Sequence, residues 1–416
     1  MITPSVDFNF TTAILDARIG FSRSGNTATV VDSSGYVSPI NANLPRFDYD
    51  PISLVCKGLL IEETRTNIFT YSADFLNTAT AGSSRPWVWS NSSVVINPSG
   101  APNSPDNTAN TNKLIENTAN STHLITHNVL VTAGTTYTAS VFAAAAEREA
   151  IYIALSNSAL WGGTLPSGIV NLSTGAVSSV SANATFTVTE FQNGFCRITI
   201  TATCGTSGTS GFQIYLRNNA NTYLGNGSSG VYLWGAQLEA LSFATSYIPT
   251  TTTAVTRNDD VATITGTNFS DWWQASKGGA QVQVTPSTVS GIRPLVQFDD
   301  NTANEIIALR GNTTNPELQI VDGGTPQATI DAGTIAANTP YSLTGWWDAN
   351  DCKARKDSGA VVADTTATIP TVTQMRIGSD GTNYLNGTIA TINYYNTFFG
   401  QLIYTRRKNK VFSSLL

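Results

Sequence analysis

The sequence contains few charged residues. Asp, Glu, Lys and Arg make up 12% of the 416 residues, about half the share found in an ordinary soluble domain. The acidic residues outnumber the basic ones by 28 to 22, which gives a formal net charge of −6 at pH 7. A nucleic-acid partner is therefore not expected, because clustered Lys and Arg side chains would be needed to neutralise its phosphates.

Long apolar runs are absent as well. No run reaches the roughly 18 residues of a membrane-spanning helix. The N-terminal MITPSVDFNF has neither the basic start nor the apolar centre of a classical export signal. We therefore expect a soluble protein without a membrane partner. Hydrophobic residues still make up 41% of the chain, and 8 Trp, 14 Tyr and 17 Phe supply enough apolar surface to exclude disorder.

The cysteines do not form the spacing of a metal site or of a disulfide framework. The sequence has four, without a Cys-x-x-Cys pair: Cys56, Cys196, Cys204 and Cys352. Cys196 and Cys204 fall on one predicted strand, roughly 26 Å apart, which is beyond the reach of a disulfide. We predict four free thiols that pack as small apolar side chains, as in a protein made in a cytoplasm.

Two residue pairs have the spacing of chemical sites. His123 and His127 are four residues apart, but the alternation in THLITHNVLV predicts a strand, which separates the two rings by roughly 13 Å and prevents them from sharing one metal ion. Glu147 and Glu149 have the spacing of paired carboxylates. We expect them at a solvated turn, whereas a catalytic acid needs burial to raise its pKa. We predict no metal site and no cofactor.

Motifs of the common enzyme classes are missing from the sequence, which has no nucleophile elbow, no P-loop and no His-Glu-x-x-His. The segment GNGSSG (225–230) matches the dinucleotide-binding fingerprint letter by letter. A strand follows it where the fingerprint requires a helix, so we predict a hairpin loop. We therefore expect that the protein is not an enzyme.

Strand alternation recurs along the chain in two groups, and Pro249 with the threonine run after it separates them. We predict an all-β fold of two consecutive antiparallel β-sandwiches of the jelly-roll type, joined at about residue 250 and preceded by an extended N-terminal β-region. The first group of strands covers 136–144, 151–155, 196–203, 212–216 and 231–238, and the second covers 280–284, 293–298, 305–309, 317–321, 341–347, 373–377 and 388–395.

Three parts of the sequence carry a resemblance to a known family. The opening motifs RFDYDP (46–51), KGLLIEETRTN (57–67) and YSADF (71–75) resemble the start of a family of tailed-bacteriophage virion proteins, which includes tail-fibre, head-fibre and spike proteins. The segment from NKLIEN to YLWGAQLEALSFATSYIPT (112–250) is similar to the jelly-roll carbohydrate-binding module that follows in those proteins. FSDWW and MRIGSDGTNYLNGTIATINYYN resemble their concanavalin A-like, or laminin G-like, sandwich.

The resemblance implies a division of the chain into four parts. Residues 1–66 would attach the protein to the virion, 67–250 would form the carbohydrate-binding-module-like jelly roll, and 251–396 the concanavalin A-like sandwich. Residues 397–416 would form a basic and aromatic tail, which differs from the short helix with which such proteins usually end. The chain also lacks the Glu-x-Asp-x-x-Glu strand of concanavalin-like glucanases, so the resemblance does not imply that activity.

The function implied is that of a structural virion protein (fibre, spike or head-decoration component) that binds bacterial surface glycan for host attachment. Its partners would be other virion proteins and bacterial surface polysaccharide. It would be made in the host cytoplasm and located in the virion. Two alternatives stay open, a glycan depolymerase on the virion and a purely structural capsid or tail protein without a ligand.

Tryptophan side chains are the candidate sugar-binding platforms, because an aromatic face packs against the C–H groups of a sugar. Trp161 in SNSALWGGTLPSG is the first candidate, since the loop has small glycines beside the indole; the alternative is that this indole folds back and closes the end of the sandwich. Trp87 and Trp89 share one strand face, so we expect at least one in the core. Trp346 and Trp347 face opposite ways, and we expect the outward ring, which we assign to Trp347, to be accessible.

The C-terminal tail is the candidate assembly segment. Basic and aromatic side chains occur together in it on an otherwise acidic protein, which suits docking to an acidic surface of another chain. Fibre and spike proteins of the family are generally homotrimers, so the resemblance implies a homotrimer here. The assembly residues that we expect are Arg406, Arg407 and Phe412.

Overall fold

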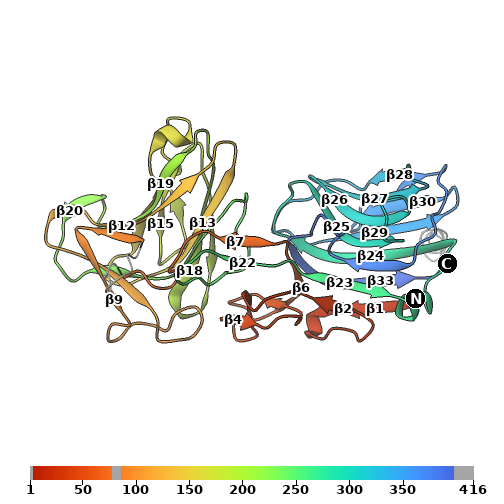
Figure 1. Cartoon of the computed structure of the whole chain (residues 1–416), viewed down its shortest axis with the longest axis horizontal. Helices are drawn as coiled ribbons and strands as arrows, with labels where there is room; N and C mark the ends of the chain where they lie inside the picture. Colours follow the sequence, from red (N-terminus) through yellow and green to blue (C-terminus); the bar gives the residue numbers. More distant parts are fainter. Residues whose placement is uncertain (1–2, 77–85, 398–416) are drawn as a thin grey trace, which may run out of the picture.

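The chain folds into two β-sandwiches that lie side by side and are joined by a narrow two-stranded ribbon (Figure 1). This computed structural model describes residues 3–76 and 86–397. The predicted all-β fold is confirmed: the described elements are antiparallel strands with four single-turn helices. None of these helices is long and apolar enough to cross a membrane. The helical turns are η1 (Phe10–Thr12), η2 (Ser158–Trp161), η3 (Gln192–Gly194) and α1 (Thr267–Ser270).

The C-terminal sandwich consists of an eight-stranded and a seven-stranded sheet around one core. The eight-stranded sheet has the order β31-β30-β29-β24-β33-β6-β5, with β1 also paired to β33. The seven-stranded sheet has the order β2-β23-β32-β25-β26-β27-β28. The strands of the first sheet are β1 (Val6–Asn9), β5 (Phe47–Tyr49), β6 (Cys56–Ile61), β24 (Lys277–Pro286), β29 (Tyr341–Asp348), β30 (Cys352–Lys356), β31 (Val362–Asp364) and β33 (Gly387–Tyr395). Those of the second are β2 (Gly20–Ser22), β23 (Val261–Thr265), β25 (Ile292–Asp299), β26 (Ile306–Asn312), β27 (Asn315–Asp322), β28 (Thr325–Asp331) and β32 (Gln374–Ile377).

The N-terminal region does not form a part of its own, which corrects the predicted division at residue 66. Strand β1 pairs with β33, so that Val6 lies opposite Tyr394, and β6 pairs with the start of the same strand. Strand β2 adds an edge to the other sheet by pairing with β23. Val6, Phe8 and Phe10 are buried in the C-terminal core. The first 66 residues therefore complete the C-terminal sandwich, because its core would otherwise lose several of its strands.

One glycine is required where β6 packs closely beside its neighbouring strand β33. Gly58 has φ of 112°, and a Cβ atom at this position would lie 2.0 Å from the carbonyl oxygen of Ile389. The backbone of β6 can approach β33 this closely only without a side chain. The glycine of the KGLLIEE segment thus helps to dock the N-terminal strands onto the C-terminal sheet.

The middle sandwich, residues 67–250, has two six-stranded sheets and a small additional pair, β11-β20. One sheet has the order β17-β18-β13-β21-β10-β9 and the other β16-β15-β14-β19-β12-β8. The strands of the first are β9 (Ser92–Ile96), β10 (Asn112–Glu116), β13 (Thr136–Ala145), β17 (Thr185–Glu190), β18 (Phe195–Thr203) and β21 (Gly230–Glu239). The others are β8 (Trp87–Ser90), β11 (Asn120–Thr122), β12 (Leu124–Val131), β14 (Ala150–Leu155), β15 (Ser167–Asn171), β16 (Val177–Ser178), β19 (Gly208–Arg217) and β20 (Thr222–Leu224).

The middle sandwich is inserted into the C-terminal one. The chain enters it through β7 (Arg65–Asn67) and leaves through β22 (Val255–Arg257), and these two strands pair with each other as an antiparallel ribbon. Thr66 lies opposite Thr256 at its centre, and their hydroxyl groups are 2.8 Å apart. The joint predicted near residue 250 therefore has two strands, and Figure 1 shows both between the sandwiches.

A second contact between the sandwiches comes from the hairpin β3 (Ala28–Val31) and β4 (Val37–Ile40). Val37 of this hairpin packs in a small apolar cluster with Phe142, Trp234 and Tyr247 of the middle sandwich. The Thr29 hydroxyl donates a hydrogen bond of 2.5 Å to the Tyr247 carbonyl oxygen. The N-terminal region thus contacts both sandwiches.

This topology predicts the result of limited proteolysis. Residues 251–254, which lead into β22 of the ribbon, are exposed and are the expected site of cleavage. The two products should remain together in native size-exclusion chromatography, because β1, β5 and β6 of the N-terminal product are strands of the C-terminal sheet. A denaturing gel should show two bands from the single native peak.

A chain that begins at Thr251 provides the control. It lacks four strands of the C-terminal sandwich and should not fold. Separate native elution of the two proteolytic products, or a stable fold for this truncated chain, would contradict the insertion.

Candidate functional site at the junction of the two sandwiches

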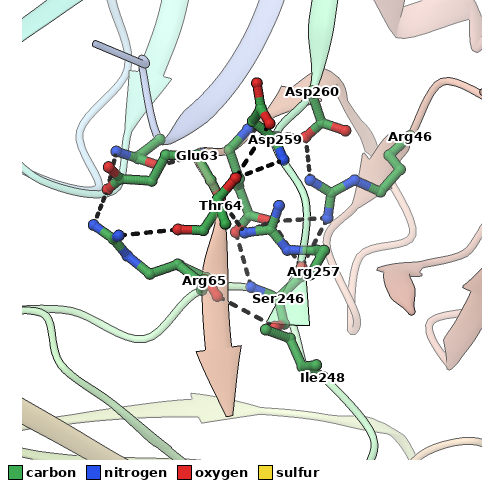
Figure 2. Close-up of polar contacts among 12 residues, drawn as sticks. Arg46, Glu63, Thr64, Arg65, Ser246, Ile248, Arg257, Asp259 and Asp260 are labelled. Atoms are coloured by element: carbon green, nitrogen blue, oxygen red, sulfur yellow. Dashed lines mark hydrogen bonds and ion pairs between the residues drawn. The ribbon is translucent and has the colours of Figure 1, made fainter. Parts of the chain in front are cut away.

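Five buried charged side chains meet where the ribbon enters the C-terminal sandwich. Each follows or precedes a strand: Arg23 comes after β2, Arg46 before β5, Glu62 after β6, Arg257 at the end of β22 and Asp260 before β23. All five side chains are at most 6% exposed. Figure 2 shows Arg46 reaching toward Asp260 on one side and toward Ser246 on the other.

The ion pairs form a continuous chain. Arg23 Nη1 lies 2.9 Å from Asp260 Oδ1, and the other carboxylate oxygen of Asp260 pairs with Arg46. Arg46 Nη1 lies 2.7 Å from Glu62 Oε2, and Arg257 Nη2 lies 3.5 Å from the same oxygen. Backbone hydrogen bonds join Glu62 and Asp260 directly, since Asp260 N donates to the Glu62 carbonyl oxygen at 3.0 Å. Charges taken out of water need such close partners to offset the cost of desolvation.

Ser246 of the middle sandwich also binds the Glu62 carboxylate. Its backbone N–H donates to Oε1 at 2.8 Å and its hydroxyl to Oε2 at 2.7 Å. Burial by itself would raise the pKa of Glu62, but Arg257, Arg46 and Ser246 together hold the pKa well below its ordinary value. The Glu62 carboxylate therefore links the N-terminal region, the ribbon and the inserted sandwich.

Amide and carboxyl side chains fix the segment that leads into the ribbon. Asn67 donates to the carbonyl oxygens of Ile248 and Ala236, at 2.8 and 3.2 Å. Gln237 accepts a hydrogen bond of 2.7 Å from Ile248 N. Glu239 accepts from both the N–H and the hydroxyl of Thr245, and burial raises the pKa of this carboxyl. These bonds hold residues 239–250 against the strands from which they emerge.

A cleft of about 220 Å³ opens beside this cluster, between the N-terminal region and the middle sandwich. Lys57 and Asp48 of the β5–β6 hairpin form an ion pair on one wall. Burial raises the pKa of the Asp48 carboxyl. Arg197, Phe191 and Tyr247 of the middle sandwich also line the cleft. Ligand sites often occupy such clefts between domains.

Next to the cleft, threonine side chains occupy the outer face of the sheet that contains β17, β18 and β13. Thr189 lines the cleft and lies opposite Arg197 in the sheet. On the same face, neighbouring hydroxyl groups lie within hydrogen-bond distance in the pairs Thr187–Thr199 (2.6 Å), Thr138–Thr201 (2.7 Å) and Thr136–Thr203 (2.8 Å). We call the eight residues of this set the threonine face: Thr136, Thr138, Thr185, Thr187, Thr189, Thr199, Thr201 and Thr203.

The tryptophans of the middle sandwich do not form an open platform. Trp161 is only 3% exposed, and its Nε1 donates to the carbonyl oxygen of Ser156 at 3.1 Å. It lies in η2 and packs into the core, so the alternative of an indole that closes the sandwich is the one observed. Trp87 is fully buried. Trp89 is half-buried and donates to the Phe75 carbonyl oxygen at 2.9 Å.

The expectation of an accessible Trp347 is wrong. Trp346 and Trp347 do alternate across β29, but both are buried. Trp347 packs in an aromatic cluster inside the sandwich, with its ring 6.0 Å from that of Trp273. Trp346 faces the other way, where the Arg355 guanidinium lies 5.8 Å from its ring centroid. Side chains on the neighbouring strand β30 thus cover the face that alternation alone predicts to be open.

Two half-buried tryptophans were not among the sugar-binding candidates predicted from the sequence. Trp272 and Trp273 follow the short helix α1 and belong to the aromatic cluster of Phe298, Trp347 and Tyr394. The sequence signal for this site is the occurrence of two adjacent tryptophans directly before the polar QASK segment. Their rings pack on Tyr394, at 4.9 and 5.2 Å between centroids, so their first role is to close the end of the core.

The remaining candidate residues lie where the sequence places them. GNGSSG forms the loop between β20 and β21, and Glu147 and Glu149 are exposed at the turn between β13 and β14. The four cysteines are free thiols, as predicted. The expected assembly residues Arg406, Arg407 and Phe412 lie outside the described residues.

The two histidines occupy separate buried environments. The ring nitrogens of His123 lie 2.6 and 3.3 Å from the carbonyl oxygens of Asn91 and Tyr223. His127 packs between Phe69 and Trp87, where burial lowers its pKa to about 4. In residues 3–76 and 86–397, no group of three or more His, Cys, Asp or Glu side chains is arranged to hold a metal ion.

Comparisons with known proteins give only remote likenesses. No family model and no curated protein sequence matches the chain. Among solved structures, the mouse laminin α1 chain, domains LG4–5, aligns at 8% identity and a TM-score of 0.24, over 66% of this chain and 86% of that one. The LG1–3 region of the laminin α2 chain aligns at 8% identity and a TM-score of 0.25, over 65% and 63%. The fold described above therefore rests on the strand pairing itself.

The charge cluster makes a prediction about stability. Glu62→Gln keeps the shape of the side chain but leaves Arg46 and Arg257 buried with less negative charge, which should lower the free energy of unfolding by about 3–5 kcal/mol. Glu63→Gln is the matched control. The side chain of Glu63 is 26% exposed and pairs with Arg65, so its loss should cost less than about 1 kcal/mol. Urea unfolding followed by tryptophan fluorescence measures both values.

The difference in the free energy of unfolding between the parent protein and Glu62→Gln should depend on pH. Because the folded protein lowers the pKa of Glu62, the stabilisation is complete above the ordinary value of 4.5 and is lost as the pH falls below it. The two unfolding curves should therefore approach each other from pH 4.5 downward. Equal costs for Glu62→Gln and Glu63→Gln, or a difference independent of pH, would contradict this role of the cluster.

Proposed function

We propose that the chain is a non-enzymatic structural component of a bacteriophage particle, of the fibre, spike or head-decoration type, and that it binds bacterial surface glycan. The observation that carries the proposal is where the family-like motifs meet. Arg46 belongs to RFDYDP, Glu62 to KGLLIEETRTN and Ser246 to TSYIPT, and these three side chains contact one another in the buried cluster. The motifs that resemble the virion family thus build the junction of this protein.

A junction of this kind suits a particle protein. Two strands, a buried charge cluster and an apolar cluster join the sandwiches, so that one can be held on the virion while the other faces the cell at a defined orientation. A single flexible linker would let them move independently. We propose that the neighbours are other virion proteins, and that the protein is a homotrimer assembled through residues 397–416.

The glycan part of the proposal is supported by the surface chemistry of the middle sandwich. Thr138 and Thr199 of the threonine face are buried, but Thr185, Thr187, Thr189 and Thr203 are exposed. Their hydroxyl groups can donate and accept hydrogen bonds with sugar hydroxyls. This supporting surface differs from the tryptophan platform expected from the sequence, because Trp161 and Trp87 are buried.

The proposal is tested on particles of the phage whose genome encodes this chain. An antibody raised against the full chain should co-sediment with purified particles and label a tail, spike or head position in electron micrographs. The full chain should also bind host cells and leave the viscosity of their purified polysaccharide unchanged. Absence from the particle would overturn the structural role, and loss of viscosity would favour a depolymerase.

A further inference from the structure

We propose that the cleft between the N-terminal region and the middle sandwich binds a sugar unit that carries a carboxylate, such as a uronic acid. This inference rests on the glycan-binding part of the proposed function and specifies the chemical class of the ligand. The observation behind it is a guanidinium group, that of Arg197, which lines the cleft without contacting a carboxylate.

The contacts of Arg197 leave it without an ion pair in the described part of the chain. Its Nη1 donates to the Thr245 carbonyl oxygen at 2.7 Å and its Nη2 to the Ser140 hydroxyl at 3.1 Å. The guanidinium also lies 5.4 Å from the centroid of the Phe142 ring. A guanidinium has five N–H donors, so donors remain for a ligand. A partly buried cation held only by neutral groups is well placed to bind an anion.

Positively charged side chains outnumber negatively charged ones at the junction beside the cleft. Three buried arginines of the junction (Arg23, Arg46, Arg257) face two carboxylates, Glu62 and Asp260. Arg197 adds a further cation, on which the buried carboxyls of Glu239 and Glu62 act at longer range. Within the described junction, the arginines therefore outnumber the carboxyl groups.

The carboxylates that line the cleft are already neutralised. Glu62 is bound by Arg46, Arg257 and Ser246, as described above. Asp48 pairs with Lys57, whose side chain is 38% exposed. Each of these two acids thus has a cationic partner of its own, and Lys57 adds a second, partly exposed cation to the lining of the cleft.

The size and the remaining lining suit one sugar ring. A volume of 220 Å³ corresponds to about seven water molecules, which is room for a single pyranose unit. Phe191 and Tyr247 supply apolar contacts for its C–H face, and Thr189 supplies a hydroxyl at the rim. From Thr189 the threonine face continues along β17 to Thr187 and Thr185, which are exposed. The remaining units of a polysaccharide can follow this face while one acidic unit occupies the cleft.

The test is ligand-observed NMR on the full chain with D-glucuronate, D-glucose and acetate as separate probes. Saturation should transfer from the protein to the ring protons of glucuronate and not to those of glucose. Thr189→Trp should fill the rim of the cleft and weaken glucuronate binding at least tenfold. Thr209→Trp is the matched control, because Thr209 is an exposed strand threonine on the other sheet of the middle sandwich and belongs neither to the cleft lining nor to the threonine face; it should bind glucuronate like the parent.

Arg197→Gln should lose glucuronate binding as well, and Thr189→Trp decides the question if this variant fails to fold. Equal saturation of glucose and glucuronate would overturn the need for a carboxylate. Full displacement of glucuronate by equimolar acetate would show a general anion site and overturn the sugar assignment. If glucuronate does not bind but the chain still binds host cells, this inference fails alone; if the chain binds no cells, the glycan part of the proposed function fails with it.

Discussion

The burial of the Glu62 carboxylate is the constraint on which the arrangement of the two sandwiches depends. A carboxylate removed from water must be surrounded by donors, and here the donors come from distant parts of the chain: Arg46, Arg257 and Ser246. Each donor brings its own element to the junction. Buried ion pairs are often nearly neutral in net stability, but they penalise other arrangements heavily because a misplaced charge stays unpaired. The cluster therefore specifies how the sandwiches join more than it strengthens either of them.

The insertion imposes an order on folding. Val6 pairs opposite Tyr394, and Glu62 N donates to the Asp260 carboxylate across 198 residues of sequence. Completing the C-terminal sandwich therefore requires the two ends of residues 67–250 to come together, which the pairing of β7 with β22 achieves. The middle sandwich is continuous in sequence and can form from its own strands. Contacts between residues so far apart make slow folding the expectation for the C-terminal sandwich.

The strands could be predicted well from the sequence, because alternation is a local property. The strand predicted at 151–155 is β14 (Ala150–Leu155), and the one predicted at 231–238 is β21 (Gly230–Glu239). Which sheet a strand joins is not local. DFNF and KGLLI are typical strand segments, and nothing in them indicates that their partner is β33, more than 300 residues later. For this reason the N-terminal strands were assigned to a separate region.

The site was harder to predict than the fold, for the same physical reason. Arg46 follows NANLP and Arg257 precedes NDD, so both read as solvated loop residues, and only the folded chain brings them to Glu62. Trp161 shows the opposite error. Glycines beside it suggest an open loop, yet the helical turn η2 directs the indole into the core. The cleft combines residues of the N-terminal region and the middle sandwich, and no segment of sequence contains its lining.

The junction should make one cooperative unit of the two sandwiches, and scanning calorimetry of the intact chain tests this most directly. Linked sandwiches should unfold in a single transition, with the calorimetric enthalpy equal to the van't Hoff enthalpy. Two separate transitions in the intact protein would show that the sandwiches are independent and would contradict the account.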